Sequence, residues 1–179
     1  MSQWRRLGRL AFLFIVAAAL LGARERGPTT PAPSATGPQE VTVAGLLVDE
    51  RSHAPTLVLQ GKRDKKSFAM VIGPAEATGI AFPLQNLTPP RPLTHDLFLT
   101  LFARLRVTVT KVVITDLRDN TYYATVYLSA NGATMELDSR PSDAIALAIR
   151  AKAPVFAEDR VFEKAEQVPG APAGPGPRI

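Results

Sequence analysis

The sequence contains no cysteine. This absence excludes disulfide bonds, thiolate metal sites, a catalytic cysteine and a lipid-modified cysteine anchor. Several local enzyme motifs are missing as well, because the chain has no HExxH zinc motif, no EF-hand loop, no glycine-rich phosphate loop and no Ser/His/Asp arrangement. Any chemistry therefore has to come from polar residues that are scattered over several segments.

Net positive charge is absent from the part of the chain that we expect to fold. The whole chain has a formal net charge of +5. Residues 1–39 carry five arginines and one acid, whereas residues 40–168 carry 15 basic and 15 acidic residues. A neutral domain still leaves room for a local basic patch, but its net charge gives no support for strong non-specific binding of DNA.

The main apolar run is shorter than a typical membrane-spanning helix. Leu10–Ala23 has 14 uncharged residues and follows three arginines near the amino terminus. A spanning helix needs about 20 apolar residues, while the core of a signal peptide needs about 7–15. We therefore interpret residues 1–26 as a signal peptide or a membrane anchor, with a mis-assigned start as a third alternative. The protein is then expected to be exported to the periplasm or the extracellular space, or anchored to the membrane by this segment.

Two segments lack the large apolar side chains that a packed core requires. Residues 27–39 and 168–179 are rich in proline and small residues, and together they hold eight of the 16 prolines. Such segments cannot bury enough apolar surface to fold. The expected organisation is a leader at 1–26, a disordered linker at 27–39, one domain at 40–167 and a disordered tail at 168–179.

The folded middle alternates between strand and helix patterns. Asn131-Gly132 indicates a type I′ hairpin, and proline at the first position predicts helices from Pro74 and Pro141. A further helix from Thr94, its expected N-cap, carries an apolar face at helical spacing. That face consists of Leu97, Phe98, Leu101, Phe102 and Leu105. Strands are expected at 41–48, 56–60, 67–72, 107–115, 121–129, 133–138 and 154–157. The order predicts an α+β fold with a mixed, largely antiparallel sheet, two main helices and a short third helix.

Candidate functional residues concentrate at the ends of these elements, where sites are usually built. They are Glu76, His95, Asp96, Asp119, Asn120, Asp138, Ser139, Arg140, Ser142 and Asp143. Each also has an ordinary structural explanation. Asp96 and Asp143 suit the first turn of a helix, Asp119-Asn120 suits a tight turn, and Ser139 or Ser142 suits a helix cap.

Phosphodiester hydrolysis is a chemistry that fits these residue types. It requires an activated water molecule and stabilisation of negative charge on phosphate. We assign Glu76, Asp138 and Asp143 as hypothetical ligands of a divalent metal such as Mg²⁺ or Mn²⁺. Arg140 is a candidate for gripping a phosphate oxygen, and His95 is a candidate proton carrier.

Three segments resemble the bifunctional nuclease (DNase/RNase) family. They are Arg91–Asp96 (RPLTHD), Lys111–Thr125 (KVVITDLRDNTYYAT) and Leu137–Ala148 (LDSRPSDAIALA). The resemblance extends over about 125 residues. It implies an α+β domain that self-associates and cleaves DNA and RNA.

The resemblance carries over all ten candidate positions but not their individual roles, which are our own hypotheses. His95, Asp96, Asp138, Arg140 and Asp143 are expected to be catalytic, and Asp119, Asn120, Ser139 and Ser142 to bind the nucleic acid substrate. The chain departs from the family pattern at residues 82–90, where prolines interrupt the expected continuation of a helix, and in its export-type leader.

Two hypotheses follow. The first is a metal-assisted nuclease acting on DNA, RNA or both. The second is a non-catalytic binding or assembly module, exported or tethered at the membrane, on the same fold. A small-molecule sensor is a weaker third hypothesis, since no ligand motif is present.

Overall fold

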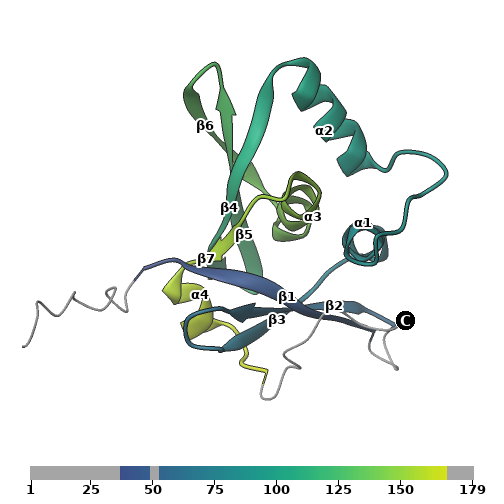
Figure 1. Ribbon diagram of the computed structural model, residues 1–179. Coiled ribbons are helices and arrows are strands. Elements are labelled where there is room, and N and C mark those ends of the chain that lie inside the picture. The colour runs from purple at the N-terminus through teal and green to yellow at the C-terminus, as the bar shows by residue number, and fades with distance from the viewer. Residues whose placement is uncertain (1–36, 49–52, 169–179) are drawn as a thin grey trace, which may run out of the picture. The chain divides into compact units, whose positions relative to one another are not determined.

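The computed structural model describes residues 37–48 and 53–168 (Figure 1). The strands are β1 (Gln39–Val48), β2 (Pro55–Gly61), β3 (Ser67–Val71), β4 (Val107–Arg118), β5 (Thr121–Ala130), β6 (Ala133–Ser139) and β7 (Val155–Ala157). The helices are α1 (Pro74–Leu84), α2 (Thr94–Arg104), α3 (Pro141–Ala151) and α4 (Asp159–Lys164). The leader assigned to residues 1–26, residues 27–36 of the linker and residues 169–179 of the tail lie outside the described residues.

All seven strands form one sheet with the order β3-β2-β1-β7-β4-β5-β6. Only the β4–β7 pair is parallel, and every other neighbouring pair is antiparallel. The short strand β7 therefore joins two antiparallel halves, β1–β3 and β4–β6. The predicted α+β fold with a mixed, largely antiparallel sheet is confirmed.

Helix α3 lies between helices α1 and α2 on one side and strands β4 and β5 on the other (Figure 1). It starts at Pro141, where a missing N–H is harmless, and ends at Lys152, whose φ of 55° closes the helix in the left-handed region. Its residues Ala144, Ile145 and Ala148 are fully buried. The alanines let the helix approach the sheet closely. The buried part of α3 therefore holds the first turn of the same helix in a fixed position.

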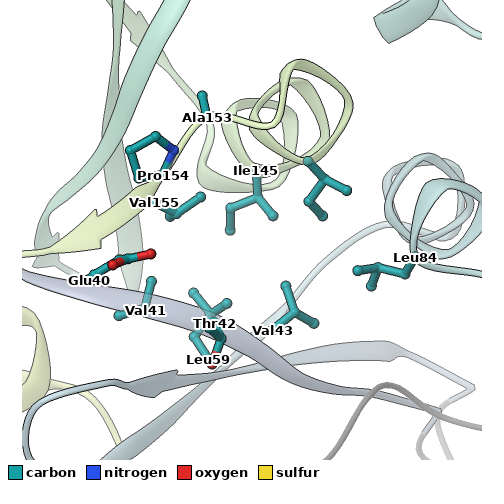
Figure 2. A pocket seen from close by; sticks show the side chains of 11 residues that line it. Glu40, Val41, Thr42, Val43, Leu59, Leu84, Ile145, Ala153, Pro154 and Val155 are labelled. Carbon is teal, nitrogen blue, oxygen red and sulfur yellow. The ribbon is translucent and has the colours of Figure 1, made fainter.

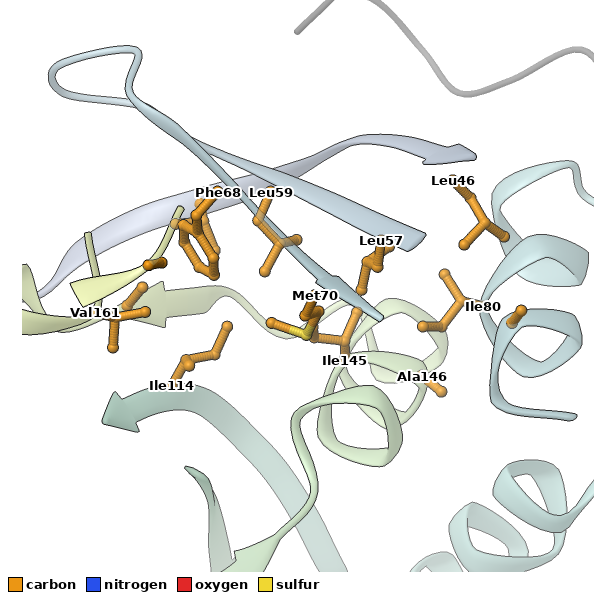
Figure 3. Close-up of a cluster of buried hydrophobic side chains, with 14 of the residues drawn as sticks. Leu46, Leu57, Leu59, Phe68, Met70, Ile80, Ile114, Ile145, Ala146 and Val161 are labelled. Carbon is orange, nitrogen blue, oxygen red and sulfur yellow. The ribbon is translucent and has the colours of Figure 1, made fainter. Parts of the chain in front are cut away.

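The hydrophobic core divides into two clusters around α3. One joins β1–β3 to α1, α3, β4 and α4, with Phe68, Ile80 and Ile145 among its fully buried members (Figure 3). The other joins Val112 and Val126 of the sheet to Ala144 and Ala148 of α3. Each fully buried large side chain contributes about 1.5–3 kcal/mol of burial free energy. The buried members of both clusters come from residues 41–165, so this part of the chain has a core of its own.

Several local expectations differ from the structure. The strand expected at 107–115 continues to Arg118, because its partner β5 pairs with it as far as Thr121. Helix α1 is as long as α2 and α3, since it continues through Pro83 to Leu84. Gln39, assigned to the linker, begins β1, and Val168, assigned to the tail, donates its backbone N–H to Ser67 O at 3.1 Å.

Helix α2 differs most from expectation. The N-cap is Leu93, and the expected N-cap, Thr94, is the first helical residue. The side chain of Asp96, the third helical residue, accepts the N–H of Leu93 at Oδ2 over 2.8 Å. The apolar face exists, but four of its five residues are exposed, and His95 is the only buried residue of the helix. No helix within residues 37–48 and 53–168 is long and apolar enough to cross a membrane.

Candidate active site at the start of helix α3

Three helices bring four of the candidate residues together. Arg140 is the N-cap of α3, Asp143 lies in its first turn, Glu76 lies in the first turn of α1, and His95 is the second residue of α2. Arg140 Nη2 lies 2.8 Å from Glu76 Oε1, and Arg140 Nε lies 2.7 Å from Asp143 Oδ2. His95 Nε2 lies 3.1 Å from the other oxygen of Asp143. We call these four residues the Arg140 cluster.

Arg140 is the exposed member of the cluster. Its side chain is 66% exposed, whereas those of Glu76 and Asp143 are 19% and 30% exposed. The hydrogen bond and charge of Asp143, followed by those of Glu76, raise the pKa of Arg140 above its usual value. Arg140 therefore presents a fully charged guanidinium to solvent, held in place by two carboxylates behind it.

His95 lies behind Asp143 and is 8% exposed. Its Nε2 faces Asp143. The other side of its ring packs against Gly79 of α1, where an added Cβ would lie 2.9 Å from His95 Cε1 and 3.0 Å from Nδ1. Both ring nitrogens thus face the interior of the domain. This arrangement suits His95 to orienting the Asp143 carboxylate rather than to reaching a substrate.

Asp96 is turned away from the cluster and pairs with Arg150 in the last turn of α3. Arg150 Nε donates to Asp96 Oδ1 at 2.7 Å, and the side chain of Arg150 is only 9% exposed. Burial on its own would raise the pKa of Asp96, but the hydrogen bonds from Arg150 and from the Leu93 N–H outweigh it and lower that pKa. Asp96 is therefore an ionised anchor that fixes α2 to α3.

Arg150 also satisfies a carbonyl group that Pro83 leaves without its helical partner. A residue at position 83 would normally donate its N–H to Gly79 O, but proline has none. Arg150 Nη1 donates to Gly79 O at 2.5 Å and to Ala146 O at 3.0 Å. One buried guanidinium thus joins α1, α2 and α3 beside the Arg140 cluster. Arg150 was not among the residues predicted from the sequence, although Pro83 inside a helix was a signal that some donor must reach Gly79 O.

The other candidates do not join the cluster. Asp138 pairs in register with Thr125, so it points to the sheet face opposite the buried Val126 and its partner Leu137. Asp119 and Asn120 form the β4–β5 turn with φ values of 47° and 59°.

The two serines lie beside the cluster, and Ser139 contacts the backbone of Arg140 rather than its guanidinium. Ser139 Oγ donates to Arg140 O at 3.1 Å. Ser142 is buried at the start of α3, and neither serine forms a side-chain cap on that helix.

The carboxylates do not gather into a metal-binding group. Among residues 37–48 and 53–168, no set of three or more His, Asp or Glu side chains has the arrangement to hold an ion. Glu76 and Asp143 both face Arg140, whose guanidinium lies where a cation between them would lie. The third hypothetical ligand, Asp138, is on the other face of the sheet. The residues as positioned do not fit the expected Mg²⁺ or Mn²⁺ site.

A cavity of about 290 Å³ lies elsewhere, between β1 and the carboxyl-terminal part of α3 (Figure 2). Its lining is mostly apolar, with Val41, Val43 and Ile145 among the residues that face it. Glu40, its one charged lining residue, forms an ion pair with Lys62. No member of the Arg140 cluster lines this cavity, and nothing in its lining suits phosphate chemistry.

Comparison with known proteins identifies the fold family. The family model of the bifunctional nuclease domain matches residues 57–169. An uncharacterized protein of Mycobacterium tuberculosis, found in strains CDC 1551 and H37Rv, is 36% identical over 126 residues, covering 70% of this chain and 75% of that protein. Bifunctional nuclease 1 of Oryza sativa subsp. japonica is 35% identical over 81 residues, covering 44% of this chain and 24% of the rice protein. The chain belongs to the bifunctional nuclease domain family.

Proposed function

We propose that this protein binds DNA or RNA at the Arg140 cluster and hydrolyses its phosphodiester bonds. The observation that carries the proposal is the exposed guanidinium of Arg140 between two partly buried carboxylates. The rice relative named bifunctional nuclease 1 supports the substrate class.

The residues of the Arg140 cluster take different roles in the proposed hydrolysis. A phosphate that approaches the exposed side of Arg140 receives charge-assisted hydrogen bonds, since the planar guanidinium has donors beyond the two that the carboxylates use. Asp143, oriented by His95, accepts a proton from a water molecule as the water oxygen forms its bond to phosphorus. The bond from phosphorus to the leaving sugar oxygen breaks, and that oxygen takes a proton from solvent.

The test is cleavage of single-stranded DNA and RNA by purified residues 37–168, which contain both core clusters. Reactions with Mg²⁺, with Mn²⁺ and with EDTA determine whether the metal dependence expected from the sequence exists. Asp143→Asn is expected to abolish cleavage. Asp138→Asn is the matched control, because it makes the same chemical change on the opposite face of the sheet, and it is expected to cleave normally.

The two variants also decide where the site lies. Equal loss in both variants would return Asp138 to the site and contradict its exclusion from the Arg140 cluster. Normal cleavage by Asp143→Asn would remove the Arg140 cluster as the active site.

The second candidate function is a non-catalytic binding or assembly module. The exposed apolar face of α2 and the lack of a three-ligand carboxylate group in the described residues favour it. A well-folded domain that cleaves neither DNA nor RNA under any metal condition, yet binds a macromolecule, would favour this function over hydrolysis.

We also propose that residues 1–26 direct the protein out of the cytoplasm or hold it at the membrane. The arginines that precede a short apolar run support this proposal. Fractionation of cells followed by amino-terminal sequencing tests it. A mature chain that begins after the apolar run indicates a cleaved signal, an intact chain in the membrane fraction indicates an anchor, and an intact soluble chain in the cytoplasm contradicts both.

A further inference from the structure

Helices α1 and α3 begin with the same local pattern and lie side by side. In both, the N-cap residue is followed by a proline and, two residues later, by an acid, in Gly73–Glu76 (GPAE) and Arg140–Asp143 (RPSD). The sixth residues of the two helices also meet, since a Cβ added to Gly79 would lie 3.9 Å from Ala146 Cβ. The two helices therefore run in the same direction, and their first turns are neighbours.

The two N-cap residues differ in what they offer to these acids. Asp143 accepts a hydrogen bond from the guanidinium of its own N-cap residue, Arg140. Glu76 has no such partner, because its N-cap residue is Gly73. Its Oε2 lies close over Gly73, where an added Cβ would overlap with that oxygen, and its Oε1 lies 2.8 Å from Arg140 Nη2. One guanidinium therefore pairs with the first-turn acids of both helices.

Gly73 is required for space and not for backbone conformation. Its φ of −74° and ψ of 159° are extended values that any residue adopts. The atom that an added Cβ would meet is the end of a flexible glutamate side chain. A larger residue at this position would therefore displace the Glu76 carboxylate and leave the helix itself in place.

The two carboxylates occupy one edge of the Arg140 guanidinium. Nε donates to Asp143 and Nη2 pairs with Glu76, and these two nitrogens belong to the same edge of the planar group. The donors of Nη1 and the second donor of Nη2 remain on the adjacent edge. Since the side chain is 66% exposed, this second edge is open to a ligand. Two parallel N–H groups on a planar guanidinium match two oxygens of one phosphate group.

We infer that Gly73 is a positioning residue for the binding of nucleic acid. Its missing side chain lets Glu76 reach Arg140, and Glu76 directs the open edge of the guanidinium toward the two non-bridging oxygens of a phosphodiester group. The identity of the ligand rests on the proposed function, whereas the position of Arg140 can be measured without it.

The loss of Glu76 from this arrangement has a definite consequence. Asp143 would then hold Nε alone, and the terminal nitrogens of Arg140 would be free to change direction. A phosphate would have to order the side chain each time it binds, which weakens binding about three- to tenfold.

A double-substitution cycle tests whether Gly73 acts on Arg140 through Glu76. Gly73→Ala and Glu76→Ala are each expected to raise the KM for single-stranded DNA about three- to tenfold. Each should change kcat less than about twofold, because Arg140 holds the phosphate equally in the ground state and the transition state. The double variant is expected to match Glu76→Ala. Gly45→Ala, whose added Cβ meets nothing within 4 Å, is the control and should keep the wild-type KM.

The position of Arg140 also has a readout that requires no activity. In the ¹⁵N NMR spectrum of residues 37–168, the Nε–H signal of Arg140 is identified by its absence from Arg140→Lys. This signal is expected to shift in the same direction in Gly73→Ala and Glu76→Ala and to stay unchanged in Gly45→Ala. A domain that cleaves no nucleic acid would contradict the proposed function, but this comparison would still decide whether Gly73 positions Arg140.

Three results would overturn the inference. The first is an Arg140 signal that is the same in Gly73→Ala as in the wild type. The second is a double variant whose KM exceeds that of Glu76→Ala by the full effect of Gly73→Ala, because Gly73 would then act independently of Glu76. The third is a Gly73→Ala variant that loses kcat and keeps the wild-type KM.

Discussion

Replacement of Gly79 by alanine tests the position of His95 with the smallest possible change. The new Cβ would lie 2.9 Å from His95 Cε1 and 3.0 Å from Nδ1. Non-bonded carbon atoms prefer about 3.5–4.0 Å, so the ring has to retreat by about 0.6–1 Å. His95 Nε2 faces Asp143 across the ring from Gly79, at 3.1 Å, so a ring displaced by this amount is pressed against Asp143, and the two groups must rotate or separate, which disrupts the bond.

Two opposing effects determine the stability of Gly79→Ala. Alanine in place of glycine inside a helix stabilises the fold by about 0.5–1 kcal/mol. Loss of a hydrogen bond to a charged group costs about 1.5–3 kcal/mol. The expected net loss is about 1–2 kcal/mol, which lowers the melting temperature by roughly 3–10 °C in a domain of this size. The cleavage rate is expected to fall more steeply than stability does, because Asp143 loses the group that orients it.

The assay combines urea denaturation with the cleavage of single-stranded substrate at a temperature where both proteins are folded. Gly45→Ala is the matched control, since an added Cβ at Gly45 meets nothing within 4 Å. It is expected to cleave like the wild type. A Gly79→Ala variant with wild-type stability and wild-type cleavage would show that the contact with Gly79 does not determine where His95 lies, and would refute this reasoning.

Three further predictions concern the arginines and Asp96. Arg150→Met should lower the free energy of unfolding by about 3 kcal/mol, measured by urea denaturation, because it leaves Asp96 without its buried partner and Gly79 O without a donor. Since the pKa of Asp96 is lowered in the folded state, its contribution to stability is complete above the unfolded pKa of about 3.9 and is lost as pH falls through the folded value. The difference in unfolding free energy between wild type and Asp96→Asn should therefore be constant above about pH 5 and shrink below about pH 4. Arg140→Lys should change stability by less than about 1 kcal/mol, because the side chain is exposed, but should lower nucleic acid cleavage at least about tenfold, since an ammonium group cannot reproduce the fork that faces two carboxylates and a phosphate.

The fold was predictable because local signals and tertiary packing agree. Pro141 at the start of a helix, Asn131-Gly132 between two strands and the alternation along β5 each match the structure. In these segments the residue that satisfies the local backbone geometry also places apolar side chains toward the core. The length of α1 was not predictable from Pro83, because the carbonyl that proline leaves unpaired is satisfied by a side chain from another helix.

The candidate site was predictable only in part, because the distance between two residues along the sequence does not show on which face of a strand or helix each side chain lies. Asp138 and Asp143 are near in sequence, but strand alternation places Asp138 opposite to Leu137 and away from α3. The alternation of side chains along β6 can be read from the sequence. It places Ser139, rather than Asp138, on the same sheet face as α3. Arg150 carried no such signal of its own, because a basic residue in the last turn of a helix has an ordinary explanation in the helix dipole.

Helix α2 holds His95 in place mainly through its first turn. Its only buried side chain is His95, and its firmest polar link to the domain is the pair between Asp96 and Arg150. Both contacts lie in its first turn, so the rest of the helix is attached mainly through the partly buried Leu99 and Phe102. The pair between Asp96 and Arg150 therefore fixes the start of the helix, and with it the direction from which His95 meets Asp143.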